Sequence, residues 1–426
     1  MAFLQPFLDL LPYRLEQALG NRNLRRARVR RRRRSTKPQT SFMKAKAASQ
    51  RRLFIDLSVI SKHDAGTGIQ RVVRALALAL IEKAGPEWEV HFVAATRRRC
   101  YHLISWPAPA EVVDFVPMEG GPGDVFIGLD YSLDAVRNHR RQLAAFRRGG
   151  GALWFLVHDL LPQEKPEWFS RNTVIRYRAW LGILADTADG FLCNSLQTEQ
   201  DLKRNLDHEF ALTTDYRTVV LPMGHKITDA PLASSKPSLR LASFDRNFPF
   251  FLMVGTLEPR KGHADVLAAF NHLWQEGANE KLVLVGKMGW QVNELREAIL
   301  HHPEHGRRLF WFDDVDDVEL HDLYEKCSGG IIASHAEGFG LPLIETLSHG
   351  KPVLARDLAI FHPHAGAGVN FFPAKADTPT LLACLRLWIG DVLNARITVQ
   401  RPDTSWEKSA SILIAAVSEC ESPIRN

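Results

Sequence analysis

Two glutamates, Glu337 and Glu345, stand on either side of a turn that contains Gly338, Gly340 and Pro342. A short apolar run precedes the turn, so the local order is strand, glycine-rich turn and helix. Glycines let a backbone approach a ligand closely, and the first N–H groups of a helix attract an anion. Glu345 falls about one turn into the helix, where it can reach a hydroxyl of the same ligand. The pattern predicts a site for a nucleotide attached to a polyhydroxylated group such as a sugar. The alternative is a plain Gly/Pro helix start with one capping acid.

Two adjacent cations, Arg260 and Lys261, follow an apolar run over residues 250–254 in a turn that also contains Thr256. Arg can neutralise a diphosphate with a bidentate fork, and Lys acts as a point charge. Taken alone, the pair is typical of a basic surface turn. Its place at a strand end of the same sheet as Glu337 favours a diphosphate site.

The next predicted strand, residues 281–285, is followed by a turn with Gly286, Met288 and Trp290. Its glycines and apolar side chains suit the wall of a base pocket. A simple tight turn explains the same residues equally well.

The first half of the chain contributes two further candidates. Residues 66–71 place Gly68 at the start of a predicted helix, which makes a second glycine-containing helix N-terminus. His158 and Asp159 follow the apolar run 153–157, so an imidazole and a carboxylate come at a strand end. A lone His at such a junction is more often structural, but this setting favours function.

Residues 313–317 contain an Asp-x-Asp pattern, which holds a divalent metal in one class of enzymes that act on sugar nucleotides. Here the acids precede a clear helical pattern, where they are favoured by N-capping and by the helix dipole. We expect a helix cap and no metal. The chain has no Walker A, GxSxG or HExxH motif, which excludes the common hydrolase readings of those patterns.

These residues depend on the elements that position them. From Arg51 onward, short apolar and β-branched runs alternate with helical patterns, which indicates parallel α/β architecture. The predicted strands are 53–56, 90–93, 125–127, 153–157, 190–193, 219–221, 250–254, 281–285, 309–312, 330–333 and 352–355. The predicted helices include 69–83, 198–205, 264–276, 292–300, 318–327 and 405–418.

The predicted fold is two doubly wound Rossmann-like domains that face each other across a cleft. We expect an N-terminal arm over 1–50, a first domain over 51–224, a Ser- and Pro-rich linker over 225–247, a second domain over 248–404 and a closing helix within 405–426. Ligands of such sheets bind at the carboxyl ends of the strands.

The composition indicates which class of protein this is. The 426 residues are 45% hydrophobic and 24% charged, as in ordinary globular proteins. No apolar run approaches the roughly 20 residues of a membrane span. Five scattered cysteines without CxxC spacing argue for a reduced, cytoplasmic compartment and against a zinc or disulfide framework.

The positive charge is local. Residues 21–52 contain 14 Lys and Arg and no acid, and residues 1–20 suggest a short amphipathic helix. The basic block follows the apolar part, so this is not a secretory signal. The arm, residues 1–52, has three interpretations: contact with an anionic membrane surface, contact with nucleic acid, or an inert solvated tail or extended start.

From about residue 51 onward, the chain resembles the retaining, GT-B-type glycosyltransferases of family 4. The resemblance is strongest over residues 250–356 and rests on the E-x7-E motif Glu337…Glu345, on the 255–262 turn and on the closing segment 405–410. Two departures are visible: Thr256 stands where many members have Arg, and the first-half turn is Gly-Thr-Gly in place of Gly-Gly.

The resemblance implies roles for these positions. Arg260 and Lys261 would hold the donor diphosphate, Glu337 and His158 would contact the donor sugar, and Glu345 would bind the ribose hydroxyls. The remaining positions expected to line the donor site are Gly68, Thr256, Gly286, Met288, Gly338, Phe339, Gly340 and Leu341. The resemblance further implies that the domain over 51–224 binds the acceptor and the domain over 248–404 binds the nucleotide-sugar donor.

The resemblance also implies transfer of a hexose with retention of configuration and without a metal or other cofactor. GDP-mannose is the favoured donor and a UDP-sugar the alternative. The expected acceptor is a glycan, a lipid-linked glycan or a lipopolysaccharide precursor at the cytoplasmic face of the membrane. Rival interpretations are a sugar-nucleotide epimerase or phosphorylase of the same fold, and a non-catalytic protein that binds membrane or nucleic acid through the arm.

Overall fold

A computed structural model describes residues 22–35, 50–64, 66–108, 115–225, 244–245 and 248–419. The chain divides into two compact units. Unit 1 comprises Met1–Ala65, Val72–Pro222 and Glu407–Asn426, and unit 2 comprises Gly66–Arg71 and Met223–Trp406. The predicted helix over 1–20 and nearly all of the predicted linker lie outside the described residues.

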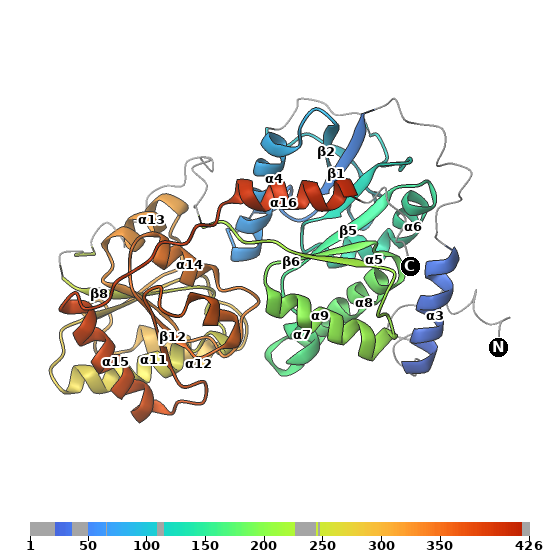
Figure 1. The fold of residues 1–426 in the computed structure, drawn as a ribbon. Coiled ribbons are helices and arrows are strands. Elements are labelled where there is room, and N and C mark those ends of the chain that lie inside the picture. The colour runs from blue at the N-terminus through green and yellow to red at the C-terminus, as the bar shows by residue number, and fades with distance from the viewer. Residues whose placement is uncertain are drawn as a thin grey trace. The chain divides into compact units, whose positions relative to one another are not determined.

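Unit 1 is built on a seven-stranded sheet of order β3-β2-β1-β4-β5-β6-β7 (Figure 1). All neighbours are parallel except β2 and β3, so the predicted α/β class is confirmed. The strands are β1 (Arg51–Asp56), β2 (Trp88–Ala94), β3 (His102–Ile104), β4 (Val125–Gly128), β5 (Ala152–Val157), β6 (Gly190–Cys193) and β7 (Arg217–Val220).

Helices cover both faces of this sheet, and that is why its central strands are continuous apolar runs and not alternating ones. Ser170 and Ser195 cap α8 and α9 by accepting hydrogen bonds from Thr173 and Thr198. The helices are α4 (Gly68–Lys83), α5 (Leu133–Asn138), α6 (Arg140–Arg148), α7 (Leu161–Glu164), α8 (Arg171–Thr187), α9 (Leu196–Phe210) and α16 (Trp406–Ser418).

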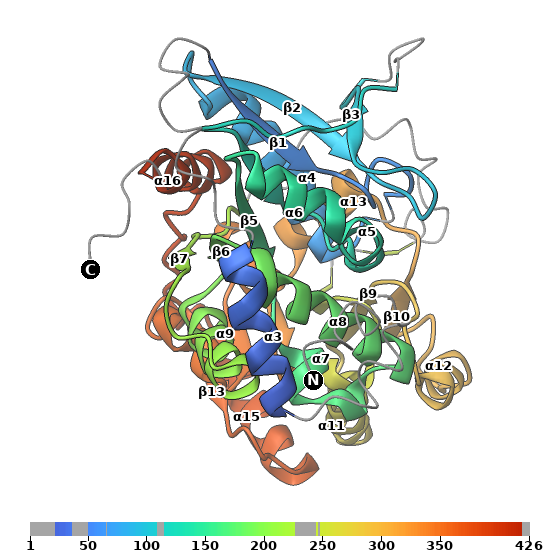
Figure 2. The same ribbon diagram turned by 90° about the vertical axis from the view of Figure 1, so that its right-hand side faces the viewer.

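The basic run folds as a helix, α3 (Arg22–Ser35), that lies along α8 and α9 (Figure 2). Val29 is buried in the unit 1 core. Arg32 donates to Asp186 at 2.7 Å, and Arg25 pairs with Glu209 at 2.9 Å. The interpretation of these residues as a solvated tail is therefore wrong for Arg22–Ser35.

Arg33 is the most deeply buried of these arginines, with 3% of its surface exposed. Its guanidinium donates to the carbonyls of Ala185, Ala188 and Asp215, and burial lowers its pKa to about 10. Arg30, Arg31 and Arg34 are exposed, so the helix has a docked face and a free basic face. Contact with a membrane or nucleic acid through that free face stays open.

Unit 2 is built on a six-stranded parallel sheet of order β10-β9-β8-β11-β12-β13. Its strands are β8 (Phe250–Val254), β9 (Lys281–Val285), β10 (Leu309–Phe312), β11 (Gly329–Ile332), β12 (Val353–Arg356) and β13 (Val369–Phe372). Numbered within the unit, this is the 3-2-1-4-5-6 order of a doubly wound fold, whose direction reverses between β8 and β11. Ligands of such folds bind outside the strand ends at that point.

Alternate residues of β8 serve two cores. Phe251 packs against α11 and α15, whereas Phe250 and Leu252 pack against α13. Asp316 caps α13 in a full capping box with Glu319, so the capping prediction for the acidic run is confirmed. The helices are η4 (Pro259–Lys261), α11 (His263–Gln275), α12 (Asn293–Leu300), α13 (Asp317–Lys326), α14 (Leu341–Ser348), η5 (Ala359–His364) and α15 (Thr378–Leu393).

Within the described residues, no helix has both the length and the apolarity that a membrane crossing needs.

Candidate functional site

The loops that follow β8 and β11 touch each other at the reversal point of the unit 2 sheet. Gly262 adopts φ 70°, and a Cβ there would lie 2.2 Å from the carbonyl oxygen of Ala333. The N–H of His335 donates to the carbonyl of Arg260 at 2.7 Å. Only glycine permits this conformation and this approach together, so Gly262 brings the basic turn against the glutamate turn.

The contact brings Lys261 and Glu337 together, although 76 positions separate them in the chain. Lys261 Nζ lies 2.5 Å from Glu337 Oε1, and Ser334 Oγ donates to the same oxygen at 2.6 Å. Arg260 Nη1 lies 3.7 Å from the other oxygen, Oε2. Burial by itself raises the pKa of Glu337, but the charges of Lys261 and Arg260 outweigh it, so this pKa lies below its ordinary value.

Arg260 is also held by Glu258, with 2.8 Å between Nε and Oε2. Both predicted diphosphate ligands are therefore already paired with carboxylates of unit 2. An incoming diphosphate can exchange with these carboxylates, because phosphate oxygens accept the same N–H donors. Such an exchange would free Glu337 for a different partner.

The turn between Glu337 and α14 has the predicted order of glycine, Pro and helix. Gly340 is the N-cap residue with φ 87°, and a Cβ there would lie 2.4 Å from Phe361. The backbone conformation and Phe361 thus explain Gly340 without a ligand. Residues Gly338, Phe339 and Leu341 are half-buried around this turn, next to the first N–H groups of α14.

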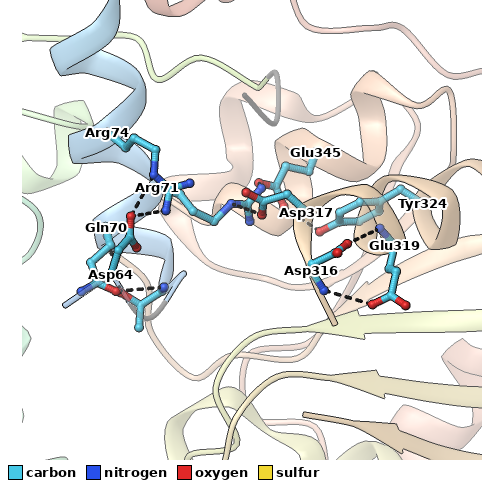
Figure 3. A network of polar contacts seen from close by, with 10 residues as sticks. Asp64, Gln70, Arg71, Arg74, Asp316, Asp317, Glu319, Tyr324 and Glu345 are labelled. Atoms are coloured by element: carbon cyan, nitrogen blue, oxygen red, sulfur yellow. Dashed lines mark hydrogen bonds and ion pairs between the residues drawn. The ribbon is translucent and has the colours of Figure 1, made fainter. Parts of the chain in front are cut away.

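Glu345 is 3% exposed, and both of its carboxylate oxygens have partners (Figure 3). Tyr324 donates to Oε2 at 2.7 Å, and Arg71 Nη2 lies 2.7 Å from Oε1. Arg71 belongs to the Gly66–Arg71 segment that groups with unit 2, and it also lies 3.6 Å from Asp317. Burial opposes the charge on Arg71, but Glu345 and its neighbours raise the pKa of this guanidinium above its ordinary value.

Gly68, in the same segment, lies against α14. A Cβ on Gly68 would be 3.8 Å from Leu341 Cδ1, so the residue adjoins the glycine turn without being forced by close packing. Arg74, further along α4 and in unit 1, donates to Asp64 at 2.8 Å (Figure 3).

The turns after β8 and β9 continue to pair beyond the strands. Leu257 donates to the carbonyl of Lys287 at 2.9 Å, and Gly289 donates back to Leu257 at 3.0 Å. A Cβ on Gly286 would lie 2.1 Å from the Gly255 carbonyl, so this glycine is required by backbone packing. Thr256 is half-buried, and Met288 and Trp290 are 41% and 38% exposed, so apolar surface is available beside the cationic turn.

His158 lies at the end of β5 in unit 1 and is 7% exposed. Burial lowers its pKa to about 4, although a hydrogen bond with the Leu129 backbone opposes the shift. The imidazole is therefore neutral at pH 7. Its Nε2 atom has no hydrogen-bond partner among the described residues.

Two carboxylates that the sequence interpretation missed flank the reversal point of the unit 1 sheet, between β1 and β4. Asp56 is fully buried and accepts hydrogen bonds from Ser58, Ser132 and Tyr101. Burial and the nearby charge of Asp130 raise the pKa of Asp56 to about 7. The sequence does carry a signal for them, since both acids stand at or just after predicted strands.

Residues 241–372 match the family described as glycosyl transferases group 1. The chain carries a glycosyl transferases group 1 domain. This domain contains the strands β8 to β13 and both turns that meet at Lys261 and Glu337.

Two relatives and one solved structure extend the comparison. A serotype-specific mannosyltransferase, WbdA of Escherichia coli, is 36% identical over 337 residues, which cover 76% of this chain and 41% of WbdA. O-antigen chain mannosyltransferase B of Escherichia coli is 31% identical over 176 residues, 39% of this chain and 45% of that protein. The matched region thus covers less than half the length of each of these two relatives.

The structure of WaaG, a glycosyltransferase involved in lipopolysaccharide biosynthesis, matches with a TM-score of 0.54 and 14% identity over 85% of this chain and 95% of WaaG. Identity this low shows the fold alone. The predicted GT-B architecture of two Rossmann-like α/β units is confirmed.

Proposed function

We propose that this chain is a retaining glycosyltransferase that moves a hexose from a nucleotide diphosphate sugar to a glycan or lipid-linked acceptor. GDP-mannose is the favoured donor, with a UDP-sugar as the alternative. The observation that carries the proposal is the Lys261–Glu337 contact at the reversal point of the unit 2 sheet. It joins a diphosphate-binding cation to a carboxylate that can face a sugar, inside a glycosyl transferases group 1 domain.

The proposed chemistry separates charge. As the bond between the anomeric carbon and the diphosphate breaks, negative charge grows on the leaving phosphate oxygen. Lys261, Arg260 and the N-terminus of α14 stabilise that charge more in the transition state than in the ground state. The acceptor oxygen bonds to the anomeric carbon from the leaving-group side, and its proton passes to the departing phosphate. Configuration is thereby retained, and these fixed cations supply the stabilisation without a metal.

Glu337 takes part by giving up its cationic partners to the incoming diphosphate. The diphosphate binds Lys261 and Arg260, and the Glu337 carboxylate turns to the sugar while Ser334 keeps one of its oxygens in place. His158 contacts the donor sugar as a neutral acceptor. Glu345 binds the ribose hydroxyls only if they replace Arg71, because both carboxylate oxygens are engaged.

The choice of mannose is supported by the names of the relatives, which are mannosyltransferases, and the polysaccharide role by the O-antigen chain. We also propose that the exposed Arg30, Arg31 and Arg34 of α3 contact anionic lipid at the cytoplasmic membrane face, where a lipid-linked acceptor lies. Replacing these three by Ala should abolish cosedimentation with phosphatidylglycerol vesicles and leave the melting temperature unchanged. Unchanged cosedimentation would contradict this membrane contact.

The first experiment is a thermal-shift screen against GDP, UDP, ADP and TDP and their sugar adducts, with and without EDTA. A ligand that binds the native state raises the melting temperature by mass action. A shift with GDP-mannose that survives EDTA supports the proposal, and a shift with UDP compounds replaces the donor. If no nucleotide raises the melting temperature, the result contradicts the proposed donor site and favours the non-catalytic interpretation.

The second experiment incubates the protein with the binding donor and a mannose oligosaccharide and assigns the new linkage by NMR. An α-linked product from an α-linked donor supports retention. An inverted product contradicts the mechanism, and an epimerised or phosphorolysed product identifies one of the rival enzymes.

A further inference from the structure

Arg356, the last residue of β12, is a buried arginine beside the glutamate turn (residues 333–340), with 1% of its surface exposed. Its Nε donates to the carbonyl of Ala333 at 2.9 Å, and its Nη1 donates to the carbonyl of Ala374 at 3.0 Å. Its Nη2 lies 2.6 Å from Oδ2 of Asp265, in the first turn of α11. One guanidinium thus joins the segments that follow β11 and β13 to α11, although Arg356 lies outside the motifs that carry the candidate site.

Asp265 extends this network to His335, the residue after Ser334. His335 Nε2 lies 3.2 Å from Asp265 Oδ2, the oxygen that also pairs with Arg356. The hydrogen bond with His335 and the charge of Arg356 outweigh the effect of burial, so the pKa of Asp265 lies below its ordinary value. The carboxylate is therefore ionised at pH 7 and holds both partners.

The network fixes the start of the glutamate turn at three points. The first is the carbonyl of Ala333, which accepts from Arg356. The second is the ring of His335, which contacts Asp265. The third is the N–H of His335, which donates to the carbonyl of Arg260 at 2.7 Å. The backbone of residues 333–335 is thereby held from three directions.

The two site residues of this turn stand within or next to the fixed segment. Ser334 lies between the fixed points, and Glu337 follows two residues after them. Ser334 Oγ donates to Glu337 Oε1 at 2.6 Å, and Lys261 Nζ lies 2.5 Å from the same oxygen. A displacement of about 1 Å in such an arrangement can cost about 10²-fold in rate, so the position of this segment matters for transfer.

Stability alone is a poor explanation of the network. A buried charged pair adds little net stability relative to apolar side chains of similar size, because desolvation offsets the attraction. What the guanidinium of Arg356 supplies, and an apolar side chain cannot, is three directed N–H donors in one plane. The network is therefore better explained by the geometry that it fixes.

We propose that Arg356, Asp265 and His335 are positioning residues for the glutamate turn, which act on the reaction through Ser334 and Glu337. None of the three needs to touch the donor. The inference rests on the proposed glycosyl transfer for its effect on rate, but the position of the Glu337 carboxylate can be measured without transfer.

His335→Ala is the first test, because His335 is exposed and its replacement should leave the fold intact. The kcat for transfer should fall about ten- to a hundredfold, as expected for a misplaced group. GDP should bind as tightly as to wild type or more tightly, because Glu337 then competes less well for Lys261. A purely structural role would weaken GDP binding and transfer together. His335→Gln, whose amide can still donate to Asp265, should recover most of the rate.

His301→Ala is the matched control. His301 follows α12, is exposed, and also lies 3.2 Å from a carboxylate oxygen, that of Glu297. Because α12 carries none of the candidate site residues, this variant should transfer at the wild-type rate. An equal loss of kcat in His301→Ala and His335→Ala would contradict the proposed positioning.

A double-mutant cycle tests whether His335 acts through Glu337. Glu337→Gln removes the carboxylate that the network positions. Adding His335→Ala to it should therefore lower kcat by no more than about a further twofold. If the two losses multiply, His335 acts independently of Glu337 and the inference fails.

Arg356→Lys extends the test to the buried end of the network. Lys keeps the charge but is a point charge, so it cannot serve three acceptors in one plane. This variant should lower kcat at least as much as His335→Ala. If Arg356→Lys does not fold, the His335 variants carry the test.

The titration of Glu337 separates this inference from the proposed function. Against the effect of burial, the charges of Lys261 and Arg260 lower the pKa of Glu337. A displaced carboxylate should therefore have a pKa nearer to its ordinary value. Carbon-13 NMR of glutamate-labelled protein measures this pKa without donor or acceptor, and Glu337→Gln identifies the signal by its absence.

A raised pKa of Glu337 in His335→Ala, but not in His301→Ala, supports the network even if no transfer is detected. An unchanged pKa of Glu337 in folded His335→Ala, or an unchanged kcat in a preparation that does transfer, would overturn the inference.

Discussion

At the carboxyl edge of the unit 2 sheet, Lys261 is already paired with Glu337, whereas at the same edge of the unit 1 sheet Asp130 and His158 each keep an acceptor without a partner among the described residues. The first edge holds cations that are neutralised until an anion replaces their carboxylates. The second holds acceptors that cost free energy until a neutral donor satisfies them. The same doubly wound topology thus presents paired ions at one edge and buried, unpaired acceptors at the other.

The proposed donor accounts for the ion pairs at the unit 2 edge. A diphosphate brings the negative charge that a buried cation needs. When no diphosphate is bound, a nearby carboxylate must pair with the cation, because an unpaired buried charge is costly. At the unit 1 edge, burial lowers the pKa of His158 and keeps it neutral. At the unit 2 edge, the buried charges remain and are paired with each other.

Lys261→Ala should have the largest effect and should separate the two edges most clearly. It removes the central diphosphate ligand, and transfer should fall about 10³-fold, the upper range for loss of one transition-state donor. Lys326→Ala, at an exposed lysine of α13, is the control. Comparable activity in Lys261→Ala and Lys326→Ala, in a steady-state assay, would remove Lys261 from the site.

Glu337→Gln should have the next largest effect. The amide keeps the shape and one acceptor but loses the charge that neutralises Lys261, so transfer should fall about 10²-fold while GDP binds equally well or more tightly. The measurement pairs kcat with calorimetric titration of GDP. Weaker GDP binding would show that Glu337 supports the cations and does not compete with the diphosphate.

His158→Asn should change how stability depends on pH. The folded-state pKa of His158 is about 4, below the ordinary value of 6.5, so in acid the unfolded chain takes up this proton first. The stabilisation is present above pH 6.5 and is lost as pH falls toward 4, by about 3 kcal/mol. Urea titrations at several pH values give the free energy of unfolding as a function of pH. Between pH 4 and 6.5 this free energy should depend less steeply on pH in the variant, by an amount that corresponds to about one bound proton. An unaltered slope would contradict a neutral, buried His158.

Tyr324→Phe should have the smallest effect and should test whether Glu345 is held for a ligand or for the fold. Removal of one hydrogen bond to a charged group costs about 1.5–3 kcal/mol of stability. If Glu345 binds ribose, GDP affinity should change by up to about tenfold as the carboxylate loses its anchor. A loss of stability with unchanged GDP affinity, read by thermal shift and calorimetry, would make Glu345 a structural partner of Arg71.

Much of the fold follows from local pattern. Strands such as 250–254, 281–285 and 309–312 coincide with the observed bounds because buried parallel strands are short apolar runs between polar turns. The predicted elements do not include the short edge strands β3 and β13 or the helices α8 and α15. Trp180 and Trp388 fill the cores beneath those two helices, and single-sequence periodicity does not show which core a long apolar helix serves.

The basic arm is the clearest case in which composition misleads. A run of arginines without acids is typical of a solvated segment, yet Arg33 is buried because three backbone carbonyls of α8 and its neighbours accept its N–H groups. Those carbonyls converge only in the folded unit. Composition cannot report them.

Residue type and periodicity are local properties, so they suffice for the α/β class, for the places of the main strands and for Lys261, Glu337 and His158 as candidates. They do not show which of these side chains meet. In the folded chain Lys261 pairs with Glu337 next to Gly262, and both oxygens of Glu345 have partners. The physical reason is that pairing and burial depend on strand order and on backbone approach between segments far apart in the chain, which no local pattern encodes.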